Sequence, residues 1–180
     1  TGVTRRRAAT HKLPRKGTYA VQIPPREGIV EPVSLDGTPR PLTFEISPIV
    51  ILSREDGDQS AKGVKINFTR ISTKKPQGKE RSQMADYLRA HGVSCVGFTT
   101  NEQYKQAVLL TAGRTCTAKV DLEATCKDCK DEKGYRLRVR GEKQFLDESG
   151  EAQTRVPCPE CGQELWVNPR ITYFVSALAK

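Results

Sequence analysis

Four cysteines form two pairs with the same spacing, Cys126-x-x-Cys129 and Cys158-x-x-Cys161. Two such pairs supply four thiolates, which make a complete tetrahedral ligand set for zinc. A closed set of four thiolates leaves no open position at which the metal could activate water. The spacing therefore predicts one structural Zn²⁺ that holds a local fold together.

C-x-x-C pairs have two other common uses. A redox-active pair occurs once, at the start of a helix, and disulfides need an oxidising compartment. Six cysteines among 180 residues are too sparse for a disulfide-stabilised secreted scaffold. We therefore expect zinc, in a reducing compartment such as the cytoplasm, nucleoid or nucleus. Cys95 and Cys116 lack the paired spacing and are expected to be buried thiols.

The segments that flank the cysteine pairs have the character of β-strands. Residues 115–125 alternate apolar and polar side chains and lead directly into Cys126, and residues 165–177 are rich in β-branched and aromatic residues. We expect these two strands to pair with each other. The metal-binding segment would then replace the turn of one hairpin of a larger sheet.

The segment between the cysteine pairs is expected to contain a hairpin of its own, with arms at 134–146 and 151–156. Cysteine pairs that bracket strands are typical of a zinc ribbon, and Gly162 after the second pair is placed where such a ribbon turns. The sequence thus predicts a zinc ribbon at 126–163, inserted in a body formed by 19–125 and 164–178.

The body is expected to be mainly β with two short helices, an α+β fold. Strands are expected at 18–23, 43–53 and 63–71, and helices from Ser82 to His91 and from Thr100 to Gly113. Pro48 indicates an edge position or a bulge within one long bent strand. The alternation in the third strand would place Val64, Ile66 and Phe68 on one face.

The net charge of +9 comes from 30 basic and 21 acidic side chains, and it is unevenly distributed. Residues 1–18 hold six basic residues and no acid, which predicts a flexible basic arm. Basic residues also gather in the loop at 70–81 and alternate along the strand at 136–140. These clusters favour a polyanionic partner. The alternatives are a solvated terminus and, for the strand, simple balance of the charge of a zinc ion with four thiolates.

The order of elements in the body and one short motif resemble a phage-type family of single-stranded-DNA-binding-like proteins encoded near recombination genes. The motif is Gly-x-x-Cys-x-Ala-x-Val, matched by Gly113, Cys116, Ala118 and Val120. The resemblance covers about residues 18–125 and 164–177. It implies an OB-like five-stranded barrel that binds single strands with a positive groove and stacking aromatic residues.

Taken together, these features predict a non-enzymatic protein that binds nucleic acid, with single-stranded DNA preferred over RNA, in replication or recombination. Protein partners within such a complex are also expected. Phosphates would be bound by Arg5, Arg6, Arg7, Lys65, Arg70, Lys74, Lys75, Lys79, Arg81, Arg136, Arg138 and Arg140. Bases would stack on Phe68, Trp166, Tyr173 and Phe174, although aromatic residues at strand spacing often fill a core.

Two functions of other classes remain open at this point. The chain could be a structural or adaptor subunit of a nucleoprotein assembly, with arm and ribbon as protein or RNA anchors. It could also be a nuclease that binds a catalytic metal through Asp56 and Asp58 or through Asp121 and Glu123. The first pair reads as a turn and the second as the outer face of a strand, so we expect no catalytic residues. No apolar run approaches the roughly 18 residues of a membrane span, and no membrane partner is expected.

Overall fold

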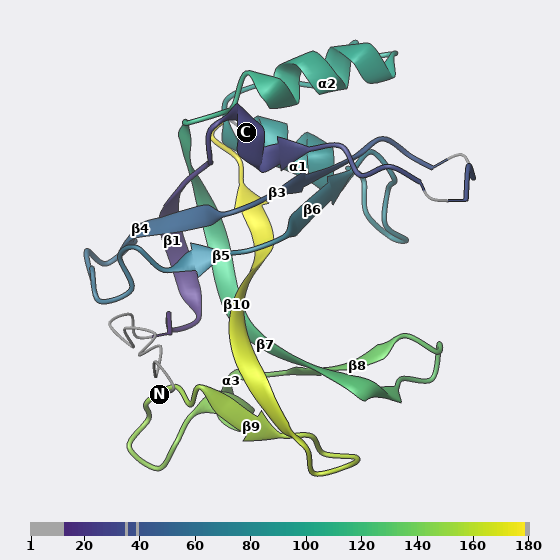
Figure 1. Ribbon diagram of the computed structural model, residues 1–180. Coiled ribbons are helices and arrows are strands. Elements are labelled where there is room, and N and C mark those ends of the chain that lie inside the picture. Colours follow the sequence, from purple (N-terminus) through teal and green to yellow (C-terminus); the bar gives the residue numbers. More distant parts are fainter. Residues whose placement is uncertain (1–12, 35, 39, 179–180) are drawn as a thin grey trace, which may run out of the picture.

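The structure is a computed structural model and describes residues 13–34, 36–38 and 40–178. Most of the predicted basic arm, including Arg5, Arg6 and Arg7, lies outside the described residues. The fold is mainly β with short helices, and its main sheet is strongly curled into a half barrel (Figure 1). None of the helices in these ranges is long and apolar enough to cross a membrane.

The main sheet has the strand order β5-β4-β1-β7-β10-β9, with β8 paired to β7, and a smaller sheet has the order β2-β3-β6. The main-sheet strands are β1 (Gly17–Gln22), β4 (Ile49–Arg54), β5 (Lys65–Ile66), β7 (Thr115–Lys130), β8 (Arg136–Arg140), β9 (Arg155–Pro157) and β10 (Glu164–Val175). The smaller sheet holds β2 (Ile29–Val30), β3 (Thr43–Ile46) and β6 (Thr69–Ser72). The helices are η1 (Arg26–Gly28), α1 (Gln83–Ala90), α2 (Asn101–Leu109) and α3 (Glu142–Phe145).

The long strands β7 and β10 form the axis of the molecule (Figure 1). They pair antiparallel from Val167 opposite Ala124 to Val175 opposite Thr117. This pairing agrees with the expectation that the strands flanking the cysteine segment form one hairpin of the main sheet. Both strands continue from the body into the cysteine-containing part, so the two parts share one sheet.

Residues 43–53 form two strands, and the prediction of one long bent strand is wrong. β3 ends at Ile46 and β4 begins at Ile49, with a cis peptide bond between Ser47 and Pro48. The two strands belong to different sheets. Because proline has no amide hydrogen to donate to a neighbouring strand, the break at Pro48 is where the chain passes from one sheet to the other.

Residues 63–71 are also divided, between β5 and β6, and here too a single strand was expected. Phe68 has a left-handed backbone with φ of 58°, which interrupts the alternation of side chains. Val64 and Ile66 are buried, as the pattern predicts, but Phe68 is 70 % exposed. The predicted common face therefore ends at Ile66.

The caps of the two predicted helices are confirmed. The amide of Ala85 donates to Ser82 Oγ over 3.1 Å at the start of α1, and Thr100 and Gln103 form a reciprocal capping box at the start of α2. α2 ends at Leu109, earlier than the predicted Gly113. The short helix α3 was not expected from the sequence.

The predicted hairpin between the cysteine pairs forms only at its turn. There the amide of Asp147 donates to the carbonyl of Glu151 over 2.8 Å, and Leu146 bridges Ala152. The predicted arms do not pair as strands, because β8 pairs with β7 and β9 pairs with β10. The physical reason is a tight turn directly after β7, where the amide of Gly134 donates to the carbonyl of Asp131 over 3.0 Å and the amide of Asp131 donates to the carbonyl of Tyr135 over 2.8 Å. This turn folds β8 back along β7, so that Arg138 and Arg140 lie opposite Thr125 and Glu123.

Buried residues form two clusters, one against the body half of β7 and β10 and one against the half that carries the cysteine-containing part. The larger cluster fills the body and includes Phe44, Met84 and Tyr87. The smaller one surrounds Phe145 in the cysteine-containing part. We call this part the ribbon; it consists of the end of β7 from Leu122, then β8, α3 and β9, and the start of β10 up to Val167. On β7 the change from one core to the other falls between Val120 and Leu122.

Candidate metal centre and basic groove

The sulfur atoms of Cys126, Cys129, Cys158 and Cys161 all lie within 4.8 Å of one another. The Sγ atoms of Cys126 and Cys161 are 3.7 Å apart, and those of Cys129 and Cys158 are 3.9 Å apart. Tetrahedral coordination with metal–sulfur bonds of about 2.3 Å separates neighbouring sulfurs by about 3.8 Å. The four cysteines therefore have the spacing needed to hold one metal ion.

The backbone around the second cysteine pair stabilises a thiolate. Hydrogen bonds from the amides of Cys161 and Glu160 lower the pKa of Cys158 to about 7, although its burial acts in the opposite direction. Gly162, with φ of 76°, turns the chain so that its own amide donates to the carbonyl of Cys158 over 2.9 Å. A left-handed residue at this turn favours glycine, which has no Cβ to clash with the backbone.

Without a cation, four such sulfurs would not all ionise together. Burial and the neighbouring sulfurs raise the pKa of Cys129 to about 12. A bound metal reverses this by stabilising the negative form of every ligand. Cys126 and Cys158 are buried in the ribbon core, so a metal there would join β7 to the turn between β9 and β10.

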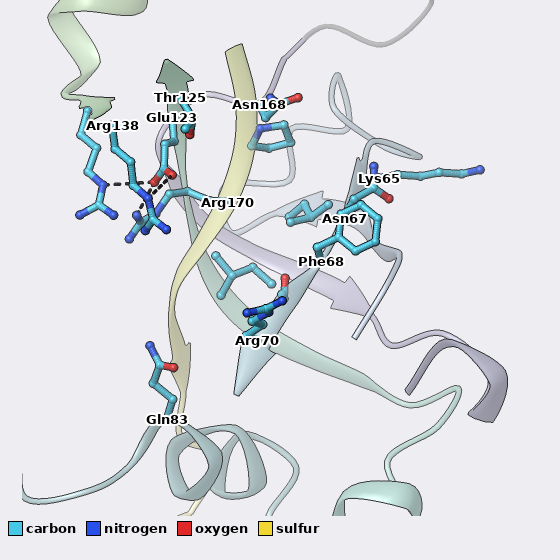
Figure 2. A pocket seen from close by; sticks show the side chains of 15 residues that line it. Lys65, Asn67, Phe68, Arg70, Gln83, Glu123, Thr125, Arg138, Asn168 and Arg170 are labelled. Carbon is cyan, nitrogen blue, oxygen red and sulfur yellow. Dashed lines mark hydrogen bonds and ion pairs between the residues drawn. The ribbon is translucent and has the colours of Figure 1, made fainter. Parts of the chain in front are cut away.

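A basic groove of about 660 Å³ lies between the body and the ribbon. We call one side of it the Phe68 wall, made by Lys65, Asn67, Phe68 and Arg70 of β5, β6 and their connection. We call the other side the arginine wall, made by Arg138 and Arg140 of β8 and Arg170 of β10. Figure 2 shows Phe68 beside Lys65 and Asn67, on the far side of β10 from Arg138.

The arginine wall is organised by one half-buried carboxylate, Glu123 of β7. Its oxygens accept from Arg170 and from Arg140 Nε over 3.1 Å, and Arg138 Nε lies 3.7 Å away. The side chain of Glu123 is only 16 % exposed. Burial raises the pKa of this carboxyl, but the hydrogen bond from Arg170 and the three nearby positive charges outweigh burial and lower it. Glu123 therefore stays ionised and orients the guanidinium groups of Arg140 and Arg170 by hydrogen bonds, while Arg138 forms a longer ion pair with it.

The groove keeps a clear excess of positive charge. Five basic side chains line it, on Lys65, Arg70, Arg138, Arg140 and Arg170, against the single acid Glu123, which leaves a formal charge of +4. Arg70 also pairs with Glu45 over 3.1 Å, outside the lining. A hollow with this charge and with low-dielectric walls concentrates anions from solution.

A smaller hollow of about 180 Å³ adjoins the groove and shares Arg70 and Gln83 with it. Lys79, Arg81 and Tyr173 line it, and Arg81 pairs with Asp86 over 3.1 Å. The basic surface thus continues from the ribbon past Phe68 to the loop that precedes α1.

The groove and the hollow bring together eight of the residues predicted to bind nucleic acid: Lys65, Phe68, Arg70, Lys79, Arg81, Arg138, Arg140 and Tyr173. Others line neither. Lys74, Lys75 and Arg136 are exposed elsewhere, and Phe174 is buried at 5 % exposure, with its ring packed against Tyr87. Trp166 lies under the guanidinium of Arg155, 4.0 Å from its ring centre.

Sequence reasoning missed Arg170. It is the only basic residue of β10, and it follows Pro169, which weakened the strand signal at this point. The polar residues Asn168 and Thr172 stand two positions away on either side. This alternation is the signal that could have assigned Arg170 to the outer face of the strand.

The carboxylates considered for a nuclease have other partners. Asp56 accepts from Arg54 over 3.1 Å and from the amide of Asp58 over 3.0 Å, and Asp58 accepts from the amide of Ser60 over 2.8 Å. These are turn interactions. Asp121 accepts from the amide of Leu122 over 2.8 Å, and Glu123 is engaged by its three arginines.

Comparison with known proteins identifies no relative. No family model matches the chain, and neither curated proteins nor solved structures include a significant match. These comparisons give no support to the resemblance with phage single-stranded-DNA-binding-like proteins. What the structure does show is the curled antiparallel sheet and the four-cysteine cluster. The groove and the four-cysteine cluster are therefore the features of the chain that point to a function.

Proposed function

We propose that this chain is a non-enzymatic nucleic-acid-binding protein that holds a single strand, preferably DNA, in the basic groove between body and ribbon. The observation that carries the proposal is the groove charge of +4, made by residues of β5, β6, β8 and β10 that converge on one hollow. Replication or recombination is the setting that fits such a protein best, because single strands are exposed there.

The arginine wall suits phosphate groups. Guanidinium groups donate several hydrogen bonds in a fixed planar fork and match phosphate oxygens in pairs. Each phosphate that is neutralised also releases condensed counterions, which adds affinity that depends on salt. Because Glu123 already orients Arg140 and Arg170 by hydrogen bonds, less side-chain entropy is lost when a strand binds.

We propose zinc as the metal held by the four cysteines. Thiolate ligands in a tetrahedral arrangement suit zinc, which is redox-inert and common in such structural sites. The ion would fix the end of β7 to the turn before β10 and so hold β8, with Arg138 and Arg140, at the edge of the groove. Metal analysis of the purified protein should give one zinc per chain.

The binding proposal is tested by fluorescence anisotropy of labelled single-stranded DNA and RNA over a series of salt concentrations. We expect affinity to fall steeply with salt. The double variant R138Q/R140Q should bind more weakly and reduce the slope of log K against log salt by about 1.4, since each lost contact with a single strand removes about 0.7.

The matched control is R136Q, because Arg136 lies on the same strand β8 but does not line the groove. It should leave the salt slope close to that of the unmodified protein. Equal losses in R136Q and R138Q/R140Q would mean that charge in general, and not the groove, attracts the oligonucleotide. Absence of binding to DNA and RNA alike would overturn the proposal and leave the adaptor function as the better explanation.

A further inference from the structure

Phe68 is placed and exposed in a way that packing does not explain. Its side chain is 70 % exposed although it lines the groove. Among the described residues, its ring has neither an aromatic partner nor a cation above it. An aromatic ring left in water within a basic groove is available to a ligand that has a flat apolar face.

The backbone at this position supports the same conclusion. Phe68 is the one residue other than glycine with positive φ in the described ranges, at 58°. A bulky residue rarely adopts this conformation because it strains the backbone, and such strain concentrates at functional sites. The alternation of β5 would have placed the ring of Phe68 in the core, on the same side as Ile66. The strained connection between β5 and β6 turns it outward instead.

The other candidate aromatic residues are less available. The ring of Trp166 is covered by Arg155 at 4.0 Å, and Phe174 is buried. Tyr173 is 39 % exposed and lines only the smaller hollow, with Lys119 Nζ 5.8 Å from its ring centre. Of the four aromatic residues considered, only Phe68 presents an uncovered ring to the groove.

The two walls of the groove thus differ in chemistry. The arginine wall presents three guanidinium groups, whereas the Phe68 wall presents a ring flanked by Lys65 and Arg70. A single strand has phosphates along one side and unpaired bases along the other. Duplex nucleic acid has the same phosphates, but its bases are stacked and paired inside, where a ring on the protein surface cannot reach them.

We infer that Phe68 is the base-stacking residue of this groove and that it makes the site selective for unpaired bases, with the backbone of the strand held on the arginine wall. This inference rests on the proposed function and names the residue that decides between single strands and duplex. Because every base has a stacking face, the selectivity concerns pairing and not base identity.

The test uses the full chain and a single-stranded oligonucleotide that carries the fluorescent base 2-aminopurine, with a duplex of the same sequence alongside. Stacking on Phe68 should quench the fluorescence of the single strand. Phe68→Ala should weaken single-strand binding roughly 5- to 150-fold, the value of one stacked base, and should abolish the quenching. Its effect on duplex binding should be much smaller.

Three further variants keep the test decisive. Phe68→Asn removes the ring with a residue that tolerates left-handed backbone, so its loss of binding cannot be attributed to misfolding if the melting temperature is retained. Phe68→Trp keeps an aromatic ring at this position and should retain both the quenching and the affinity of the unmodified protein. Tyr135→Ala is the matched control, since Tyr135 is similarly exposed at 69 % but lies outside the groove.

The outcomes separate this inference from the proposed function. If single strands bind with the expected salt dependence but Phe68→Ala and Phe68→Asn keep full affinity and quenching, the assignment of Phe68 is overturned and the proposed function stands. Equal weakening of single-strand and duplex binding in both variants would also overturn it. If the unmodified protein binds neither ligand, the proposed function itself falls.

Discussion

The body and the ribbon share one sheet but are stabilised in different ways. Among the described residues, the body core contains 22 buried side chains and the ribbon core only nine, two of which are cysteines of the metal centre. A cluster as small as that of the ribbon buries too little apolar surface to offset the entropy of ordering its chain. We therefore expect the body to fold by burial alone and the ribbon to need a metal ion bound by its four cysteines.

This difference has a functional consequence because the groove lies where the two parts meet. The Phe68 wall belongs to the body, and Arg138 and Arg140 of the arginine wall belong to the ribbon strand β8. We therefore expect one side of the proposed binding site to depend on apolar packing and the other on a metal ion held by the four cysteines. Perturbing the two parts separately should show which property each contributes.

The largest effect is expected from Cys158→Ser, which removes a metal ligand. Structural zinc supplies about 10–16 kcal/mol in small zinc-dependent folds, so the ribbon should lose its structure while the body remains folded. Metal content should fall below one ion per chain, and proteolysis should begin within residues 126–163. Affinity for single strands should drop because β8 is no longer held in place.

Cys95→Ser is the matched control, since Cys95 is half-buried in the body and lies outside the cluster. It should retain the metal and the resistance of the ribbon to proteolysis. A Cys158→Ser variant with full metal content and an intact ribbon would contradict the comparison between the two parts.

The next largest effect is expected from truncating one large buried ring in each core. Phe44 is 1 % exposed in the body and Phe145 is fully buried in the ribbon. Each change to alanine should cost about 3–5 kcal/mol of local stability. Phe44→Ala should lower the melting temperature measured by circular dichroism, whereas Phe145→Ala should mainly speed up metal release to a chelator. If both variants change the melting temperature and the rate of metal release equally, the body and the ribbon are not stabilised in different ways.

A smaller, pH-dependent effect is expected in the body from His91 at the end of α1. Burial, and then the charge of Arg114, lower its pKa from 6.5 to about 4. The unfolded chain therefore binds this proton more readily than the folded one, and the free energy of unfolding should decrease as the pH falls from about 6.5 to about 4. Urea unfolding at several pH values measures this.

Acidic residues also titrate in that range, so the effect of His91 is obtained by difference. His91→Gln should flatten the pH dependence of stability above pH 4 relative to the unmodified protein. Identical profiles for the two proteins would show that His91 is not kept neutral by its surroundings.

The smallest effect is expected from Thr100→Ala at the start of α2. The substitution removes the side-chain acceptor of the Gln103 amide, which lies 3.3 Å away. Loss of such a cap costs about 0.5–2 kcal/mol. The melting temperature of the body should fall slightly, and metal content should be unchanged. A loss of metal in this variant would mean that the two parts are coupled more tightly than their separate cores indicate.

Local patterns in the sequence were sufficient for several features. The spacing of the cysteines identified the four that cluster in the structure, and Ser82 and Thr100 marked the starts of the helices, because these signals act within a few residues. The alternation of residues 115–125 and the apolar character of 165–177 identified the two long strands. The sequence alone therefore determined the cysteine ligand set and the mainly β class.

Tertiary structure alone decided the pairing of β8 with β7, the exposure of Phe68 and the meeting of Lys65 and Arg70 with Arg138 and Arg140. Lys65 and Arg70 lie more than sixty positions before Arg138 and Arg140 in the chain. No local pattern specifies which strands will meet over such a distance. Curling of the main sheet brings β5 to the groove that β8 also lines, and the chain then passes into β6 of the smaller sheet. The left-handed backbone of Phe68 between the two strands directs its ring into the groove. The clustering of the four cysteines thus follows from their spacing in the sequence, because each pair is local. The groove forms only in the folded chain, where the body core and the ribbon core meet.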